Sequence, residues 1–269
     1  MFPGVNGFHF SAGHLIFLGV FFTVVAIVAV TVLMAVLRSW RTFREGRAEQ
    51  VLWLSDFHDL PKADRACRHA ITGECEGRTC ARGFDCRECE NHAKMASPAA
   101  AQQEEVFGLP YPSDRFYHRG HTWVKAEEDG TVLVGLDEIG RRLAGKPDEL
   151  RLPAPGTPVS VNGTAWHMRR GQAEARVLAP VDGIVVETGG SQGEWWLRVK
   201  PATSDFSHLL RGAEVSAWVR RELDRLQLAL PSQGLGTTLA DGGVLVEDIA
   251  SACTGKDLDN LYGKMFLEP

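Results

Sequence analysis

Residues 152–184 read LPAPGTPVSVNGTAWHMRRGQAEARVLAPVDGI, and this stretch alternates short apolar runs with turn signals. Gly156, Asn162 and Gly171 mark three of the turns, because Gly and Asn accept the backbone angles that tight turns require. The runs between them are rich in Val, Thr, Leu and Trp, which favour strands. The stretch therefore predicts a series of short strands and hairpins, with a tight tip at Gly171.

The sequence on either side extends this pattern. Residues 123–126 and 131–135 are strand-like runs that flank an acidic, glycine-ended turn, so they predict another hairpin. Residues 137–143 predict a short amphipathic helix. Apolar side chains recur at helical spacing between residues 209 and 226, which predicts an amphipathic helix packed on the sheets.

With Tyr117, His121 and Trp123 upstream, the pattern resembles the H protein of the glycine cleavage system. The resemblance covers residues 117–226. It implies a mainly β domain at residues 113–226, a lipoyl-domain-like β-sandwich (a hybrid barrel) with a C-terminal helix. In that family the hairpin tip carries a lysine that is lipoylated and shuttles an aminomethyl group.

The lysine that the resemblance calls for is missing. A gapless alignment of residues 152–183 with the family pattern places Gln172 at the lysine position, and Arg169 and Arg170 replace the Glu-Ser pair before it. No lysine lies between Lys146 and Lys200. Lipoylation forms an amide on an amine, and a carboxamide is not such a nucleophile. We therefore expect the fold without the carrier chemistry, and no lipoate.

The N-terminal part of the chain is strongly apolar. Residues 1–37 contain no Lys, Arg, Asp or Glu, and residues 15–37 are almost wholly apolar. About 20 such residues cross the hydrocarbon core of a bilayer. The sequence therefore predicts a retained transmembrane helix at residues 14–37, rather than a signal peptide with a basic start and a cleavage site.

The charges that follow predict the orientation of this helix. Arg38, Arg41, Arg44 and Arg47 come directly after the apolar run. The positive-inside rule then places residues 1–13 outside and the rest of the chain in the cytoplasm, anchored in the inner membrane by one pass. Residues 38–60 are predicted to form a basic juxtamembrane helix.

Residues 61–95 hold five of the six cysteines, and in the cytoplasm such a density favours metal ligands over disulfides. Cys86 and Cys89 form a C-x-x-C pair, which lets two thiolates reach one metal from a single turn. A metal would also stabilise a segment with few large apolar residues. The predicted ligands are Cys75, Cys80, Cys86 and Cys89, with Cys67, His69 or His92 as substitutes for the fourth.

The metal itself stays open between zinc and an iron–sulfur cluster, since both take four thiolates. A redox switch through Cys86 and Cys89, or reduced thiols without a ligand, are the other interpretations. The segment with its Phe-Asp-Cys-x-x-Cys motif is also similar to one that precedes H-protein-like domains in some bacterial membrane proteins.

Two further regions complete the predicted organisation. Residues 96–112 are predicted as a linker, because they begin with small and polar residues without apolar periodicity. Residues 227–269 form an acidic tail whose short apolar-patterned elements are expected to dock on this domain or on a partner. His167 is interpreted as an exposed side chain, with Trp166 and Met168 facing the core.

The chain is predicted to be a non-catalytic adaptor, because no nucleophile, base and oxyanion site and no phosphate-binding loop can be assembled from it. It would be tethered to the membrane and present the metal module and the β-sandwich to a protein partner. Its net charge of −5 argues against nucleic-acid binding, and no small-molecule substrate is predicted. The alternatives are an electron-transfer or accessory subunit of a membrane redox complex, and a working glycine cleavage carrier.

Overall fold

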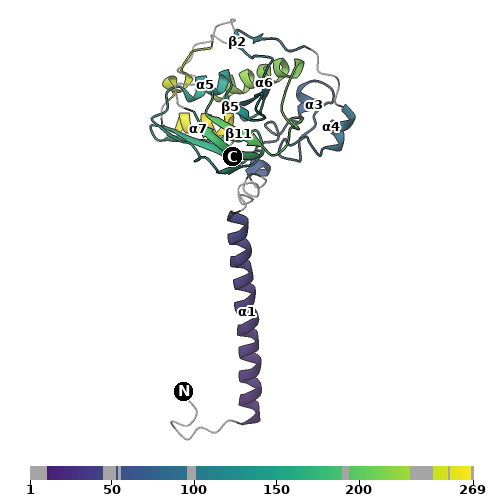
Figure 1. Cartoon of the computed structure of the whole chain (residues 1–269), viewed down its shortest axis with the longest axis vertical. Helices are drawn as coiled ribbons and strands as arrows, with labels where there is room; N and C mark the ends of the chain where they lie inside the picture. The colour runs from purple at the N-terminus through teal and green to yellow at the C-terminus, as the bar shows by residue number, and fades with distance from the viewer. Residues whose placement is uncertain are drawn as a thin grey trace. The chain divides into compact units, whose positions relative to one another are not determined.

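The computed structural model describes residues 11–44, 53, 56–95, 101–189, 194–230, 245–253 and 255–267. The chain divides into two compact units, Met1–Ala48 and Glu49–Pro269 (Figure 1). The described helices are α1 (Ala12–Arg44), α3 (Arg68–Ile71), α4 (Glu90–Met95), α5 (Glu138–Ala144), α6 (Ala213–Ala229) and α7 (Lys256–Met265), with the 3₁₀-helix η1 (Ile249–Ala252). The described strands are β1 (Glu105–Val106), β2 (Leu109–Pro110), β3 (Phe116–Tyr117), β4 (Thr122–Ala126), β5 (Val132–Leu136), β6 (Glu149–Arg151), β7 (Pro158–Val159), β8 (Thr164–Arg170), β9 (Ala173–Leu178), β10 (Gly183–Thr188) and β11 (Leu197–Pro201).

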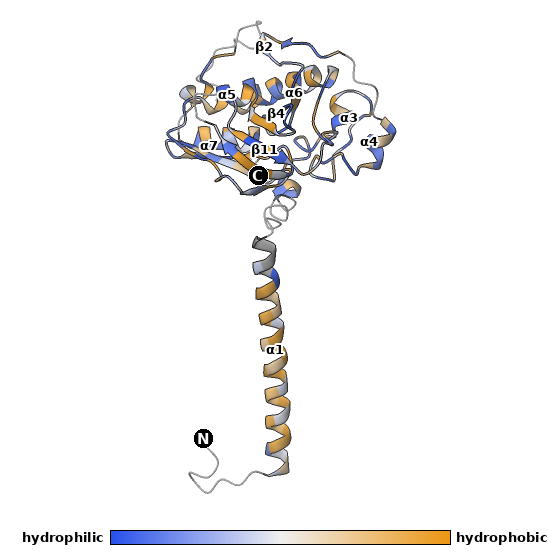
Figure 2. Cartoon of the chain, viewed as in Figure 1, coloured by the Kyte–Doolittle hydropathy of each residue, from blue (hydrophilic) through white to orange (hydrophobic). Residues whose placement is uncertain are grey.

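The first unit is dominated by α1, which is apolar along most of its length (Figure 2). Ala12–Arg38 is long and apolar enough to cross a membrane, with a mean hydropathy of 2.9. A signal sequence near an N-terminus has the same features, so the helix is a candidate span. The helix continues through Arg44, beyond the predicted end at residue 37. Residues 1–10 and part of the predicted juxtamembrane helix lie outside the described residues.

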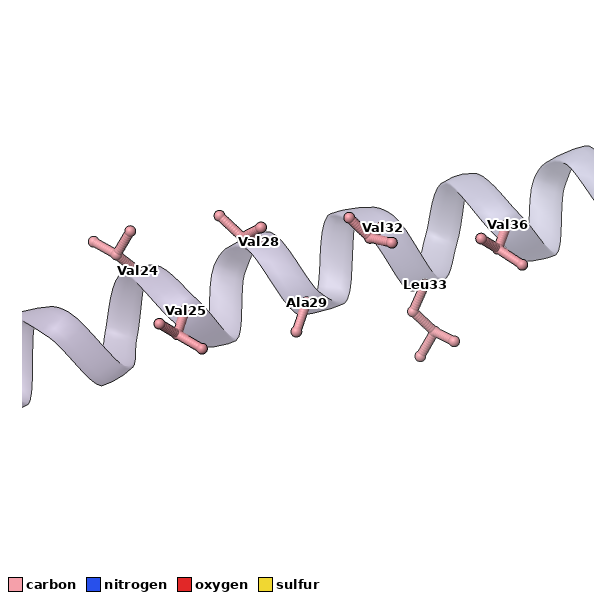
Figure 3. Close-up of a pocket in the computed structure, with 7 residues that line it drawn as sticks. All are labelled: Val24, Val25, Val28, Ala29, Val32, Leu33 and Val36. Atoms are coloured by element: carbon pink, nitrogen blue, oxygen red, sulfur yellow. The ribbon is translucent and has the colours of Figure 1, made fainter.

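Figure 3 shows a groove on α1 between the side chains of Val24, Val28 and Val32 on one side and Val25, Ala29 and Leu33 on the other. All of its lining residues come from this one helix. Valines at four-residue intervals line up as a ridge, because residues four apart share a helix face. The groove is therefore a surface feature of a single helix and not an enclosed cavity.

The second unit is a two-sheet β domain with helices packed on it. The larger sheet has the order β3-β4-β5-β11-β10-β7 and the smaller β6-β8-β9, with a separate β1-β2 pair. Both sheets place alternate side chains in one core: Val134 from β5 and Val177 from β9 are fully buried there. The rings of Trp166 and Trp196 lie 5.1 Å apart within this core. The lipoyl-domain-like sandwich with a C-terminal helix is thus confirmed.

Local sequence signals explain several of these elements. Asp137 caps α5, since its carboxylate accepts the N–H of Gly140 at 2.7 Å, as expected for an N-cap aspartate. In α6, the side chains of Val215, Trp218 and Leu226 are buried at helical spacing. The predicted hairpin of β4 and β5 and the helix α5 are confirmed. The second predicted helix is α6, which begins at Ala213 rather than at Leu209 and ends at Ala229.

Most of the predicted linker at residues 96–112 belongs to the folded domain. Residues 101–112 carry β1 and β2, and Val106, Leu109 and Tyr111 are buried in the main core. Tyr111 packs against Tyr117 and Trp218, with ring centroids 5.2 and 6.3 Å away. Burial of these three side chains makes the segment part of the domain. Residues 96–100 lie outside the described residues.

The C-terminal segment docks on its own domain. Ile249, Leu258, Leu261, Met265 and Phe266 are buried in the same core as the sheets, and α7 packs on β9 and α6. Of the two outcomes that the sequence left open, docking on this domain or on a partner, the structure shows the first. The intervening residues 231–244 are outside the described part of the chain.

Candidate functional site

The β8–β9 hairpin ends in a two-residue turn. Arg170 pairs with Ala173 across the strands, which leaves Gly171 and Gln172 as the turn. Gly171 has a φ of +60°, which glycine adopts without the steric cost that other residues carry. Its N–H donates to the carboxylate of Asp148 at 2.6 Å. Gln172 is exposed at the tip, so the predicted tip at Gly171 is confirmed.

The two arginines before the turn are held by acidic partners. Arg169 donates to Glu149 at 2.7 and 2.9 Å, and Arg170 donates to both carboxylate oxygens of Asp248 at 2.6 and 3.0 Å. The hydrogen bonds from Arg170 lower the pKa of Asp248. Because Asp248 caps η1, this ion pair fixes the C-terminal segment beside the hairpin tip.

The chemistry available at the tip is limited by Gln172. Its carboxamide offers hydrogen-bond donors and an acceptor but no nucleophilic amine. The lysines nearest in sequence are Lys146 and Lys200, and neither belongs to β8 or β9. The tip can therefore make polar contacts with another molecule but cannot form the amide that attaches a lipoyl group.

The domain also contains a buried cluster of titratable side chains that the sequence did not reveal. His121 is fully buried, with Nδ1 3.0 Å from Asp137 and Nε2 3.7 Å from Glu222. Burial would lower the pKa of His121, but the carboxylates of Asp137 and Glu222 outweigh it and raise the pKa to about 9. Burial would likewise raise the pKa of Glu222, but the charges of Arg225 and His121 lower it to about 2. The raised pKa of His121 and the lowered pKa of Glu222 favour the charged forms of both groups at neutral pH.

A second buried histidine has the opposite state. His118 Nε2 lies 2.9 Å from Asn162 Oδ1, and the Gly120 N–H donates to His118 Nδ1 at 3.0 Å. Nδ1 is therefore the acceptor and Nε2 the donor, the arrangement of a neutral imidazole. Burial, with the nearby charge of His208, lowers the pKa of His118 to about 3. Both histidines are tied to core residues, which favours a structural role.

In the cysteine segment, all the cysteines are free thiols. Cys67 and Cys80 lie on two short antiparallel stretches: the Cys67 N–H donates to Arg78 O at 2.7 Å, and the Cys80 N–H donates to Arg65 O at 2.7 Å. The sulfur of Cys80 accepts the N–H of Arg82 at 3.4 Å. The thiolate is the form of cysteine that binds metals.

Cys86 and Cys89 are joined by a turn in which the Cys89 N–H donates to Cys86 O at 3.1 Å. Burial raises the pKa of Cys86 to about 12, with the charge of Arg68 acting against it. Burial would also raise the pKa of Cys89. Hydrogen bonds from the backbone N–H groups of His92 and Asn91 outweigh this effect and lower the pKa of Cys89.

Histidines form a second polar group in this segment. His69 Nε2 lies 3.0 Å from His92 Nδ1, and His69 Nδ1 contacts the carboxylate of Glu74. His69 is buried. Cys75 follows directly, and its N–H donates to His69 O at 3.1 Å. The structure therefore places Cys75 beside the histidines.

The donors have the types that zinc or iron prefers, and they lie in one segment. As placed, however, no three of the His, Cys, Asp and Glu side chains among the described residues are arranged to hold a metal ion. The thiols would have to draw closer by side-chain rotation, since tetrahedral zinc needs Zn–S distances of about 2.3 Å. Metal binding by Cys75, Cys80, Cys86 and Cys89, or by Cys67 and His69, stays a prediction.

The cysteine segment also packs against the β domain. Phe84 shares a second core with Phe57 and Leu178 of β9. The guanidinium of Arg119 lies 3.7 Å from the centre of the Phe84 ring, and it donates to Ala66 O at 2.7 Å. These long-range contacts attach the segment to the domain, and its sequence alone could not indicate them.

The comparisons with known proteins match the part of the chain that forms the β domain. The family model of the glycine cleavage H-protein matches residues 115–191. Glycine cleavage system H protein 2 of Aquifex aeolicus is 30% identical over 142 residues, which cover 47% of this chain and 88% of that protein. The glycine cleavage system H protein of a Psychrobacter species is 31% identical over 120 residues, covering 39% and 95%. The crystal structure of the H protein from Mycobacterium marinum aligns with a TM-score of 0.35 at 23% identity, covering 41% and 98%.

The curated relatives are thus matched over most of their length, whereas they account for less than half of this chain. The matched residues include the β8–β9 hairpin, and α1 and the cysteine segment lie before the family match. The chain belongs to the glycine cleavage system H-protein family.

Proposed function

We propose that this chain is a membrane-tethered, H-protein-like adaptor that carries no lipoyl group and has no catalytic activity of its own. The observation that supports this most directly is Gln172 at the exposed tip of the β8–β9 hairpin. The matched relatives are named as components of glycine cleavage. A carrier role for this chain is disfavoured, because the tip offers no amine for the attachment of lipoate.

The tethering part of the proposal rests on α1. The helix is long and apolar enough to span a bilayer, and Arg38 and Arg41 follow the apolar run. An inner-membrane anchor would hold the β domain at the cytoplasmic surface. There it would present its surface to a protein partner of the membrane or the cytoplasm.

Intact-mass measurement tests the lack of a lipoyl group. The chain is expressed in cells with active lipoyl ligase, together with an ordinary H protein as the positive control. We expect the control to gain the mass of a lipoyl group and this chain to stay unmodified. A lipoyl mass on any lysine of this chain would overturn the adaptor proposal.

A reciprocal variant sharpens the same test. Gln172→Lys supplies the amine but leaves Arg169 and Arg170 in place, whereas the triple variant R169E/R170S/Q172K restores the family residues. Because a ligase reads the surface around the lysine, we expect modification of the triple variant to exceed that of Gln172→Lys. Equal modification would show that the two arginines do not contribute.

The proposal also includes a metal module in the cysteine segment, with zinc as the metal. The support for this part is the arrangement of the thiols in one segment, with Cys86 and Cys89 in one turn and Cys67 and Cys80 on two bridged stretches. Elemental analysis of anaerobically purified protein tests it. About one equivalent of zinc supports a structural module, whereas iron with acid-labile sulfide favours electron transfer in a membrane redox complex. The absence of both zinc and iron would refute this part of the proposal. The lipoyl argument would be unaffected.

A further inference from the structure

We propose that Cys67, and not Cys75, completes the metal-binding thiol set with Cys80, Cys86 and Cys89. This inference rests on the proposed metal module and specifies its ligands. The sequence prediction has Cys75 in the ligand set and Cys67 as a substitute. The fold of the segment points to Cys67 instead.

The first argument is the backbone geometry around Cys67 and Cys80. Ala66 and Thr79 form an antiparallel bridge, so the residues on either side of the bridge pair across the two stretches. Cys67 and Cys80 then stand diagonally on the same face, since side chains alternate along each stretch. Diagonal neighbours have Cβ atoms roughly 7 Å apart or less. Rotation of the two side chains moves their sulfur atoms closer together, as binding to a common metal requires.

The second argument is the surroundings of Cys86. The side chains of Arg68, Cys80, Cys67 and Cys89 lie near the Cys86 thiol, within range of electrostatic interaction with it. The three cysteines in this group are the other members of the proposed set. Cys89 follows in the same turn as Cys86, so the C-x-x-C pair and the Cys67–Cys80 pair approach one another. Two pairs of thiols that approach from two turns form the usual arrangement of a four-cysteine site.

The third argument is Arg68, which immediately follows Cys67. Its guanidinium donates to Glu214 of α6, with Nε at 2.7 Å, and to Ser207 O at 2.6 Å. The side chain is therefore fixed by the β domain beside the thiol of Cys86. A site of four thiolates and one Zn²⁺ carries two net negative charges, and a fixed cation at this place would offset part of them.

Cys75 lies in a different environment. It follows α3 in the loop that joins the two bridged stretches. Its N–H donates to His69 O at 3.1 Å. The neighbouring side chain of Glu74 contacts His69. Cys75 and Glu74 thus contact His69, which makes Cys75 the natural control for the test.

The test uses the full chain in mild detergent, purified under reducing conditions. The Cys75→Ser/Cys253→Ser variant keeps Cys67, Cys80, Cys86 and Cys89 as its only thiols. We expect it to retain the metal content of the natural chain, with four sulfur neighbours by X-ray absorption at the edge of the bound metal. Because only four thiols remain, four sulfur neighbours require Cys67 to be a ligand. This outcome needs no variant that disturbs the buried Cys67.

The reciprocal variant is Cys67→Ser, which is expected to lower bound metal to well under half of an equivalent while Cys75→Ser leaves it unchanged. Loss of metal in Cys75→Ser, or fewer than four sulfur neighbours in the double variant, would overturn the assignment of Cys67. These results differ from failure of the metal proposal itself, in which the unsubstituted chain already binds no metal.

Discussion

At the scale of single residues, His121 is the centre of a buried charged cluster in the β domain. Its side chain is fully buried between Asp137 and Glu222. Removing one partner of a buried ion pair leaves the others without compensation, which typically costs about 3–5 kcal/mol. We expect His121→Gln to lower the free energy of unfolding by this amount, measured by chemical denaturation in mild detergent.

The matched control is His167→Gln. His167 pairs with Glu174 at 3.3 Å, but both side chains are about 40% exposed, and exposed ion pairs contribute little. We expect a change within about 0.5 kcal/mol. Similar effects of the two substitutions would contradict the ionised cluster at His121.

Two buried histidines, His121 and His118, predict how stability depends on pH. The pKa of His121 rises from 6.5 to about 9 on folding, so its contribution is complete below pH 6.5 and is lost as pH rises to about 9. The pKa of His118 falls from 6.5 to about 3, so its contribution is complete above pH 6.5 and is lost as pH falls to about 3. The free energy of unfolding is therefore expected to be greatest near pH 6.5.

Thermal unfolding at a series of pH values tests this profile. Each pKa unit corresponds to about 1.4 kcal/mol, so the loss between pH 6.5 and 9 is expected to reach about 3 kcal/mol from His121 alone. His121→Gln removes this alkaline decline but keeps the acidic one. Stability that increases from pH 7 to pH 9 would contradict the assignment.

At the scale of elements, the sequence predicts what local signals determine. The β8–β9 tip follows from Gly171, and α5 follows from the cap of Asp137. These signals act within a few residues, so no knowledge of the rest of the chain is needed. The position of Gln172 at the tip, the main fact of the candidate site, was accessible for the same reason.

Elements whose placement depends on distant partners were not predictable. The second half of the predicted linker is ordered because Tyr111 finds Tyr117 and Trp218. The cysteine segment is held by Arg119 and Arg68, which reach across more than fifty residues of sequence. Spacing alone could not distinguish Cys67 from Cys75, since it does not show which stretches pair.

The C-terminal helix α7 gives a prediction at this scale. Phe266 at its end is fully buried and makes an edge-to-face contact with Tyr262, with ring centroids 5.9 Å apart. Truncation of a buried Phe to Ala costs about 3–5 kcal/mol. We expect Phe266→Ala to destabilise the β domain by this amount in chemical denaturation followed by Trp fluorescence.

Leu228→Ala on α6 is the control for this substitution. Leu228 is 85% exposed, so its truncation is expected to change stability by less than about 0.5 kcal/mol. If Phe266→Ala were equally mild, the C-terminal segment would not be part of the domain core.

At the scale of the whole molecule, the chain combines an apolar helix with a separately packed β domain. The side chains of α1 are exposed along the helix, with Leu15 at 59% and Phe22 at 62%. Such a surface is unfavourable in water, because each Å² of exposed apolar surface costs about 25 cal/mol of free energy. A bilayer removes that cost, which is why the helix and the positive charges after it favour a tether.

The orientation of this tether is the last prediction, and the native cysteines report it. All six cysteines lie after α1, whereas Ser11 precedes it and is exposed. With the N-terminus outside, a membrane-impermeant maleimide added to intact spheroplasts is expected to modify Ser11→Cys but not the natural chain. After lysis and denaturation both are modified, which shows that the thiols are intact. Labelling of the natural chain in intact spheroplasts would reverse the orientation. It would also place the cysteine segment in an oxidising compartment, where disulfides replace metal as the expected state of such thiols.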